Sequence, residues 1–338
     1  MTKMYKLLFL SILMMSTMIS ISAYSWLGMW IGLEINLMSV IPIIQEKSIL
    51  SSEASIKYFI TQAIASTIIM MTIIMMMWKS NFLSSVNFNS IMITIMNSSL
   101  MLKMGMAPLH FWFPEVLEGL NWNNCLLMLT WQKITPMVLI MYNTEFNLFM
   151  STVIISSMII SSLMSMNQIS IRKIMAYSSI NHMGWMMSTM ITEKTIWMIY
   201  FIIYSMITIN ITLMLKNIFY LNQLFPNISI SSSMKMFFML NFMSLSGIPP
   251  FLGFLPKWLT IQSMIMNNMY LLPIIMIMFT LIMVYVYMRI TMTTLILISS
   301  QMNWNLKINL KINKMSISMM NFFSMMSLII VTVGFNLM

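Results

Sequence analysis

The sequence is poor in charge. Lysine, arginine and glutamate together make up 7% of its 338 residues, aspartate is absent, and the mean hydropathy is +0.88. Soluble domains carry about 25% charged residues, and a soluble globular fold could not cover this much apolar surface. The lipid bilayer is therefore the expected solvent, and in it only α-helices and closed β-barrels satisfy their backbone hydrogen bonds.

Groups that carry redox or nucleotide chemistry are also scarce. The single cysteine, Cys125, excludes an internal disulfide and a cysteine metal cluster. The two histidines lie on distant segments and make no convincing haem site, and no glycine-rich nucleotide loop or Ser/His/Asp arrangement is present. We therefore expect no redox centre, NADH site, cofactor or metal ion on this chain.

Long apolar runs are what the sequence does contain. They last twenty residues or more, which favours helices over barrel strands. The predicted fold class is an all-α polytopic membrane protein, a single membrane domain of about eleven transmembrane helices. No small-residue cleavage site follows the first run, so it is read as a span rather than a signal peptide. The predicted spans are residues 4–23, 25–45, 57–78, 89–113, 122–142, 147–166, 171–191, 195–216, 236–264, 269–290 and 315–336.

The loop cations are distributed unevenly across these spans. Twelve loop lysines and arginines fall on the side of the N-terminus and two, Lys79 and Lys194, fall on the other side. This positive-inside bias accounts for the net charge of +10 without a nucleic-acid partner. An odd number of spans also places the two termini on opposite sides of the membrane.

The abundance of methionine points to the coding system. Fifty-one methionines accompany many isoleucines, asparagines and lysines, as expected of an A+T-rich gene read with a code in which AUA specifies methionine. That code is typical of mitochondria, so the N-terminus is expected in the matrix and the C-terminus in the intermembrane space. A flexible methionine-rich core is the alternative.

An internal repeat joins residues 105–115 and 247–257. Glycine and two prolines at 105, 108 and 114 recur at 247, 250 and 256 with identical spacing. Each proline removes a backbone donor and clashes with the preceding turn, so both segments should break their helices. They lie in the fourth and ninth spans and would run in opposite directions, as in transporters built from inverted repeats. We expect repeats at 1–145 and 146–300, then a loop and C-terminal helix at 301–338; chance similarity of two Gly-Pro kinks is the alternative.

Four ionisable residues lie inside predicted spans: Glu34, Lys103, Lys133 and Lys257. A charge at the centre of a membrane helix costs about 2.5–3.5 kcal/mol, so four unpaired charges would cost on the order of 10 kcal/mol. Burial favours the neutral form of a lysine and a nearby carboxylate favours the charged form. A lysine whose partner moves away can therefore release a proton, and we predict that the four residues form a proton relay.

Other polar side chains could extend the relay through water. Pairs at i,i+4 spacing mark one face of the third and seventh spans: Gln62 with Ser66, Tyr177 with Asn181, and Ser178 with His182. His110 and His182 titrate near neutrality and could bridge gaps. Alternatively, His110 caps the backbone freed by the first break and His182 is a satisfied interior histidine.

Structural roles are also open for the charged residues. Lys257 could extend its ammonium group to the membrane interface, and Glu34 with Lys103 could form a static ion pair. Lys57 and Glu53, spaced i,i+4 at a span entrance, are interpreted as an interfacial pair rather than relay residues.

Six segments resemble the subunit 2 family of mitochondrial NADH dehydrogenase, one of the antiporter-like membrane subunits of respiratory complex I. The resemblance covers nearly the whole chain, and the methionine-rich composition looks like an insect or other invertebrate version. The segments are WLGMWIGLEINL at 26–37, SSEASIKYFITQA at 51–63, KMGMAPLHFWFPE at 103–115, LTWQKITP at 129–136, RKIMAYSSINHMGW at 172–185 and LSGIPPFLGFLPKW at 245–258.

The resemblance implies a specific site and setting. In this family a glutamate and three lysines form a polar axis in the membrane, and the matching positions are Glu34, Lys103, Lys133 and Lys257. The family has two inverted five-helix repeats with broken fourth helices. It implies a multi-pass protein of the mitochondrial inner membrane, with other complex I membrane subunits and phospholipids as partners. FMN, iron–sulfur clusters and ubiquinone would be bound by other subunits.

The leading hypothesis is therefore a proton-translocating subunit of complex I. A cation/proton antiporter subunit would use the same fold features. A structural assembly subunit, whose charges only fix helix packing and which has no proton path of its own, is the third possibility.

Overall fold

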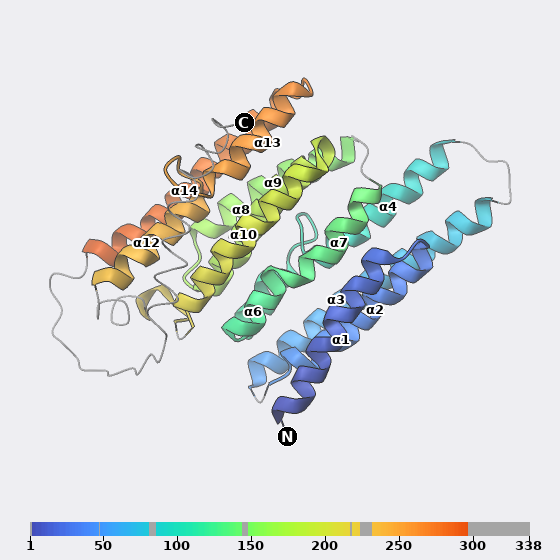
Figure 1. The fold of residues 1–338 in the computed structure, drawn as a ribbon, viewed down its shortest axis with the longest axis horizontal. Helices are drawn as coiled ribbons and strands as arrows, with labels where there is room; N and C mark the ends of the chain where they lie inside the picture. Colours follow the sequence, from blue (N-terminus) through green and yellow to red (C-terminus); the bar gives the residue numbers. More distant parts are fainter. Residues whose placement is uncertain are drawn as a thin grey trace, which may run out of the picture. The chain divides into compact units, whose positions relative to one another are not determined.

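The computed structural model describes residues 2–46, 48–80, 86–143, 148–216, 218–223 and 232–296 (Figure 1). Within these ranges the chain is helical and contains no β-strand; one isolated bridge pairs Ser170 with Tyr220. The predicted all-α fold class is confirmed. The chain divides into two compact units, residues 1–153 and residues 154–338.

In the first unit, α3 and α7 each pack against three other helices. Helix α3 packs against α2, α4 and α5, while α1 forms a hairpin with α2, and α7 contacts α1, α4 and α6. The long α3 exceeds the span predicted at 57–78 because it begins at Ile49. The helices of this unit are α1 (Thr2–Ser22), α2 (Trp26–Ile44), α3 (Ile49–Ser80), α4 (Val86–Met104), α5 (Trp112–Gly119), α6 (Trp122–Leu129) and α7 (Trp131–Tyr142).

In the second unit, α9 lies at the centre. It packs against α10, α13 and α14, and nearly all of its side chains are buried, which explains why so polar a helix is compatible with an apolar protein. Helix α12 contacts α10 and α14. The chain enters this unit within α8 (Leu148–Met166), and the later helices are α9 (Ile171–Thr192), α10 (Lys194–Met214), the 3-10 turn η1 (Leu221–Gln223), α12 (Ser232–Ser246), α13 (Phe254–Met266) and α14 (Leu271–Ile296).

Seven helical segments in the described residues are long and apolar enough to cross a membrane. They correspond to predicted spans one, two, three, five, six, eight and ten. The proline repeat interrupts the helices as predicted: in the region of the fourth predicted span α4 ends at Met104 and α5 begins at Trp112, and in the ninth α12 ends at Ser246 and α13 begins at Phe254. The seventh is α9, and the predicted span at 315–336 lies outside the described residues.

One interruption is not anticipated by the sequence. The predicted fifth span, 122–142, is divided into α6 and α7 at Thr130. The Thr130 hydroxyl donates to the carbonyl of Leu126, at 2.8 Å. Such local side-chain bonds compete with regular helix geometry and often bend helices.

Candidate functional site

The first broken helix is closed by its own backbone. Helix α4 ends at Met104, and Gly105 follows with φ of +71°, a left-handed conformation that glycine adopts without a side-chain clash. The amide of Gly105 donates to the carbonyl of Leu102, and the amide of Met106 donates to the carbonyl of Met101, both at 3.1 Å. This is the hydrogen-bond pattern of a Schellman helix end, so the predicted break is a well-formed helix terminus.

Lys103 occupies the last turn of α4, where a helix dipole favours a cation. Its side chain is 7% exposed, and its main-chain carbonyl accepts a 3.1 Å hydrogen bond from the side-chain amide nitrogen of Gln62 on α3. Glu34 lies half-buried on α2. The ion pairs among the described residues do not join Glu34 to Lys103. The static contact pair that the sequence left open is therefore not formed.

Lys133 is buried against an aromatic ring. It lies on α7, which packs on α4, and its side chain is 1% exposed. Its Nζ is 5.1 Å from the ring centroid of Phe113, within range of a cation–π interaction. Phe113 also packs so closely on the first break that a Cβ at Gly105 would lie 2.7 Å from the Phe113 Cβ. The geometry of the break therefore sets the position of the ring that contacts Lys133.

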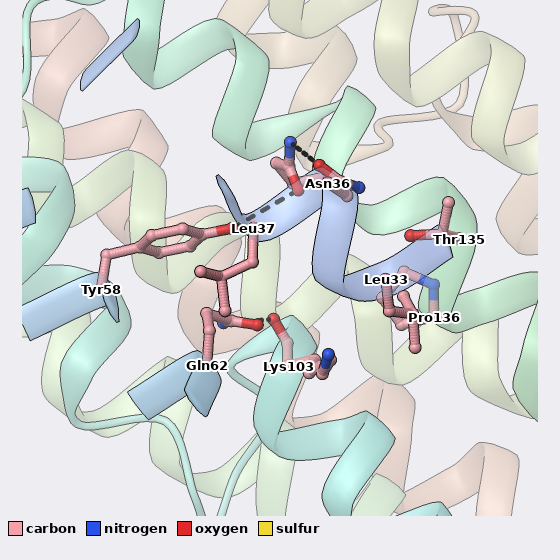
Figure 2. A pocket seen from close by; sticks show the side chains of 9 residues that line it. Leu33, Asn36, Leu37, Tyr58, Gln62, Lys103, Thr135 and Pro136 are labelled. Atoms are coloured by element: carbon pink, nitrogen blue, oxygen red, sulfur yellow. Dashed lines mark hydrogen bonds between the residues drawn. The ribbon is translucent and has the colours of Figure 1, made fainter. Parts of the chain in front are cut away.

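A small polar cavity adjoins Lys103, with about 20 Å³ available to the centre of a water molecule. Figure 2 shows Tyr58, Gln62 and Lys103 around it, with Asn36 and Thr135 from the neighbouring helices. About 10–15 Å³ by this measure suffices for one water, provided that polar partners are near. The remaining lining residues are Leu33, Leu37, Gln132 and Pro136.

The second broken helix ends in the same way but is capped differently. Helix α12 ends at Ser246, and Gly247 has φ of +79° with its amide donating to the carbonyl of Ser244. Lys257, in the first turns of α13, donates from Nζ to the carbonyl of Ser246 at 2.7 Å. Its side chain is 9% exposed, and Nζ lies 5.9 Å from the centroid of the Trp185 ring. Lys257 is therefore turned into the break rather than extended to the membrane interface.

The repeat aligns Lys257 with Glu115, which also follows a break. Glu115 forms a 2.9 Å ion pair with Lys57, and Lys57 forms a second one with Glu53 at 2.8 Å. The predicted i,i+4 contact between Lys57 and Glu53 is therefore formed, in the first turns of α3 and with both side chains partly exposed. The matched positions after the two breaks thus carry opposite charges with different partners.

The two histidines have different surroundings. His110 lies between the two halves of the first broken helix, and its Nδ1 is 3.3 Å from the carbonyl of Pro108. His182, on α9, is buried and its Nδ1 lies 2.9 Å from the hydroxyl of Tyr200 on α10. Tyr177 and Ser178, one turn earlier on α9, are buried as well. The contact of His110 fits a role in capping the backbone at the break, and the contact of His182 fits a hydrogen-bonded interior histidine. Both contacts are also compatible with a relay.

Some polar contacts were missed by sequence reasoning. Gln132 donates from its amide nitrogen to Asn36 Oδ1 at 3.0 Å, and the Tyr58 hydroxyl donates to Gln132 Oε1 at 3.5 Å. Tyr200 and Tyr204, both buried, share one face of α10 beside His182. Their i,i+4 spacing within an apolar span was the available signal, whereas nothing in the sequence links Asn36 to Gln132.

Three residues of the predicted series, Glu34, Lys103 and Lys133, belong to the first unit, and Lys257 belongs to the second. Within each unit the lysines lie beside a helix break and inside the packed helices.

Comparisons with known proteins agree with this architecture. A family model described as NADH:quinone oxidoreductase/Mrp antiporter, TM, matches residues 23–283. NADH-ubiquinone oxidoreductase chain 2 of Anopheles gambiae is 46% identical, over 100% of both chains. The chain of the same name from Locusta migratoria is 43% identical, over 93% of this chain and 92% of its own length. A chain of respiratory complex I from Thermus thermophilus, solved with bound aureothin, superposes with a TM-score of 0.79 at 19% identity, over 86% of this chain and 70% of that chain.

Proposed function

The chain belongs to the NADH:quinone oxidoreductase/Mrp antiporter family of membrane proteins, and from that premise we propose that it is a core membrane subunit of mitochondrial NADH:ubiquinone oxidoreductase. In that role it takes part in moving protons across the inner mitochondrial membrane. Relatives that match it over nearly the full length carry the name of this oxidoreductase. A separate antiporter has weaker support.

The observation that carries the proton-translocation proposal is the burial of three lysines beside two matched helix breaks. Lys103, Lys133 and Lys257 are all less than a tenth exposed, inside helices that carry no other charged residue. Buried ionisable groups in membrane segments are costly and generally mark ion or proton paths. With Glu34, they form the proposed relay.

The chemistry required of these residues is proton uptake and release. Removal from water disfavours the ammonium form of a lysine, whereas a carboxylate or a helix C-terminus favours it. Lys103 lies in the last turn of α4, and Glu34 is proposed as the carboxylate that influences it. A small change in the distance to either one would change its affinity for a proton. His110, His182, Tyr177 and Ser178 are proposed to extend the path through water.

The remaining features of the setting are part of the same proposal. The N-terminus lies in the matrix and the C-terminus in the intermembrane space, and residues 1–145 and 146–300 are inverted repeats. FMN, iron–sulfur clusters and ubiquinone are bound by other subunits. The partners are other membrane subunits of the complex, including further antiporter-like subunits, and phospholipids.

Lys133→Met in the assembled complex tests the relay. Methionine keeps much of the length of lysine but cannot carry a proton, so the number of protons translocated per NADH should fall while the complex still assembles. The matched control is Lys216→Met, which removes an exposed lysine beyond the end of α10 and should leave the ratio unchanged. An unchanged ratio in an assembled Lys133→Met complex would refute the relay role of Lys133. Impaired assembly with normal pumping in the complexes that do form would support the structural-subunit reading.

A further inference from the structure

The end of α4 has a carbonyl that its own backbone does not satisfy. The Schellman pattern at Gly105 occupies the carbonyls of the two residues before Lys103. The carbonyl of Lys103 accepts instead from the side chain of Gln62, which comes from α3, 41 residues earlier in the chain. Carbonyls in the last turn of a buried helix need such a partner, because an unpaired buried polar group is costly.

Other contacts dock the broken segment on the same stretch of α3. The Tyr58 ring lies 5.9 Å from the Trp112 ring, and Lys57 pairs with Glu115 at 2.9 Å. Of these contacts, only the one from Gln62 reaches the residue that carries the proposed proton site. Gln62 is 4% exposed, and its hydrogen bond is therefore shielded from solvent.

Gln62 also forms part of the wall of the polar cavity beside Lys103 (Figure 2). Its amide nitrogen is engaged by the carbonyl of Lys103, which leaves its amide oxygen as an acceptor. A series of hydrogen bonds from Tyr58 through Gln132 to Asn36 also lines the cavity and fixes a second set of polar groups there. A water molecule in this space would find the two to four polar partners that buried water requires.

We propose that Gln62 is a positioning residue for Lys103: its hydrogen bond to the Lys103 carbonyl holds the end of α4 so that Lys103 remains at the wall of a cavity with room for one water. The inference rests on the proposed function, because it assigns Gln62 a role in proton transfer through Lys103. Gln62 itself gains and loses no proton.

The experiment is a double-mutant cycle of Gln62→Met and Lys103→Met in the assembled complex. Methionine matches glutamine in length and removes only the hydrogen-bonding groups. Coupled proton translocation per assembled complex should fall roughly two- to tenfold in Gln62→Met, as expected for one lost hydrogen bond, and its pH profile should move. On the Lys103→Met background, Gln62→Met should have no further effect, because residues acting through one another are not additive.

A matched control is available in the second unit. Gln168 also donates from its side-chain amide to a main-chain carbonyl, that of Met164, at 3.2 Å, but in a more exposed setting between α8 and α9. Gln168→Met should leave translocation and its pH profile unchanged. If Gln62→Met prevents assembly, Gln62→Asn is the second variant. It keeps the amide but is one carbon too short to reach Lys103, so we expect the same fall in translocation and the same change in pH profile.

The outcomes separate the inference from the proposed function. Additive effects of Gln62→Met and Lys103→Met, or a Gln62 variant that loses stability but pumps normally with an unmoved pH profile, would overturn the positioning role. If Lys103→Met and Lys133→Met both leave translocation unchanged, the proposed relay fails, whatever the Gln62 variants do.

Discussion

Gly105→Ala should destabilise the protein for two reasons. The first is conformational: φ at residue 105 is +71°, and the left-handed conformation costs a residue with a Cβ about 1–2 kcal/mol. The second is steric: the new Cβ would lie 2.7 Å from the Cβ of Phe113, so the backbone or the ring must move. Loss of the two Schellman hydrogen bonds, at about 1 kcal/mol each, would bring the total to roughly 3–4 kcal/mol.

The functional consequence of that substitution follows from the ring that must move. Phe113 contacts the ammonium group of Lys133 at 5.1 Å, so its displacement should lower proton translocation even in complexes that assemble. The assay is thermal disassembly on native gels together with protons translocated per NADH. Gly28→Ala is the control, since Gly28 lies in α2 without a left-handed φ, and a Cβ there would lie 3.2 Å from the Ala23 Cβ and the Ser25 hydroxyl, a milder contact than 2.7 Å. If Gly105→Ala and Gly28→Ala give the same disassembly temperature and the same ratio, the reasoning is wrong.

Two other predictions concern the second break and the orientation of the chain. Lys257→Met removes the donor to the Ser246 carbonyl and should destabilise the assembled complex by about 1.5–3 kcal/mol, measured as faster thermal disassembly. Lys257→Arg retains a donor and should lose less stability. Equal losses in the two variants would contradict the capping role. An impermeant thiol reagent added to mitochondria without an outer membrane should label Lys194→Cys but not Lys6→Cys, because the proposed topology places only residue 194 on the intermembrane-space side. The native Cys125 is buried and should add little background labelling. The reverse pattern would place the N-terminus outside the matrix.

The two helix breaks share a backbone geometry but are capped by different residues. Both place glycine in the left-handed conformation and a proline at the third position of the following helix, Pro114 in α5 and Pro256 in α13, where the missing amide hydrogen is not needed. They differ in the donor that caps the last turn. An amide from a distant helix serves the first break, and the proposed relay lysine itself serves the second. Proton loss at Lys257 would therefore weaken its hydrogen bond to the Ser246 carbonyl. At the first break, capping belongs to Gln62 and proton binding is proposed for Lys103, so proton loss leaves the capping hydrogen bond in place.

Much of the fold followed from composition and local rules. The absence of aspartate and the scarcity of other charges required a membrane solvent, and long apolar runs required helices. Most predicted spans correspond to helices within a few residues, because a helix in lipid must satisfy its backbone internally and its length is set by the bilayer. The interruption at Thr130 was missed because a threonine in an apolar run is compatible with a continuous helix.

What the sequence determined by itself was the class of protein, the two helix breaks of the Gly-Pro repeat and the identity of the buried lysines, since each of these depends on composition or on neighbours along the chain. Only the tertiary structure decided their partners: Gln62 for the Lys103 carbonyl, the Phe113 ring for Lys133, and the end of α12 for Lys257. Helical periodicity tells which residues share a face, but not which face of another helix it meets. Those contacts depend on packing between segments tens of residues apart, and no local pattern encodes them.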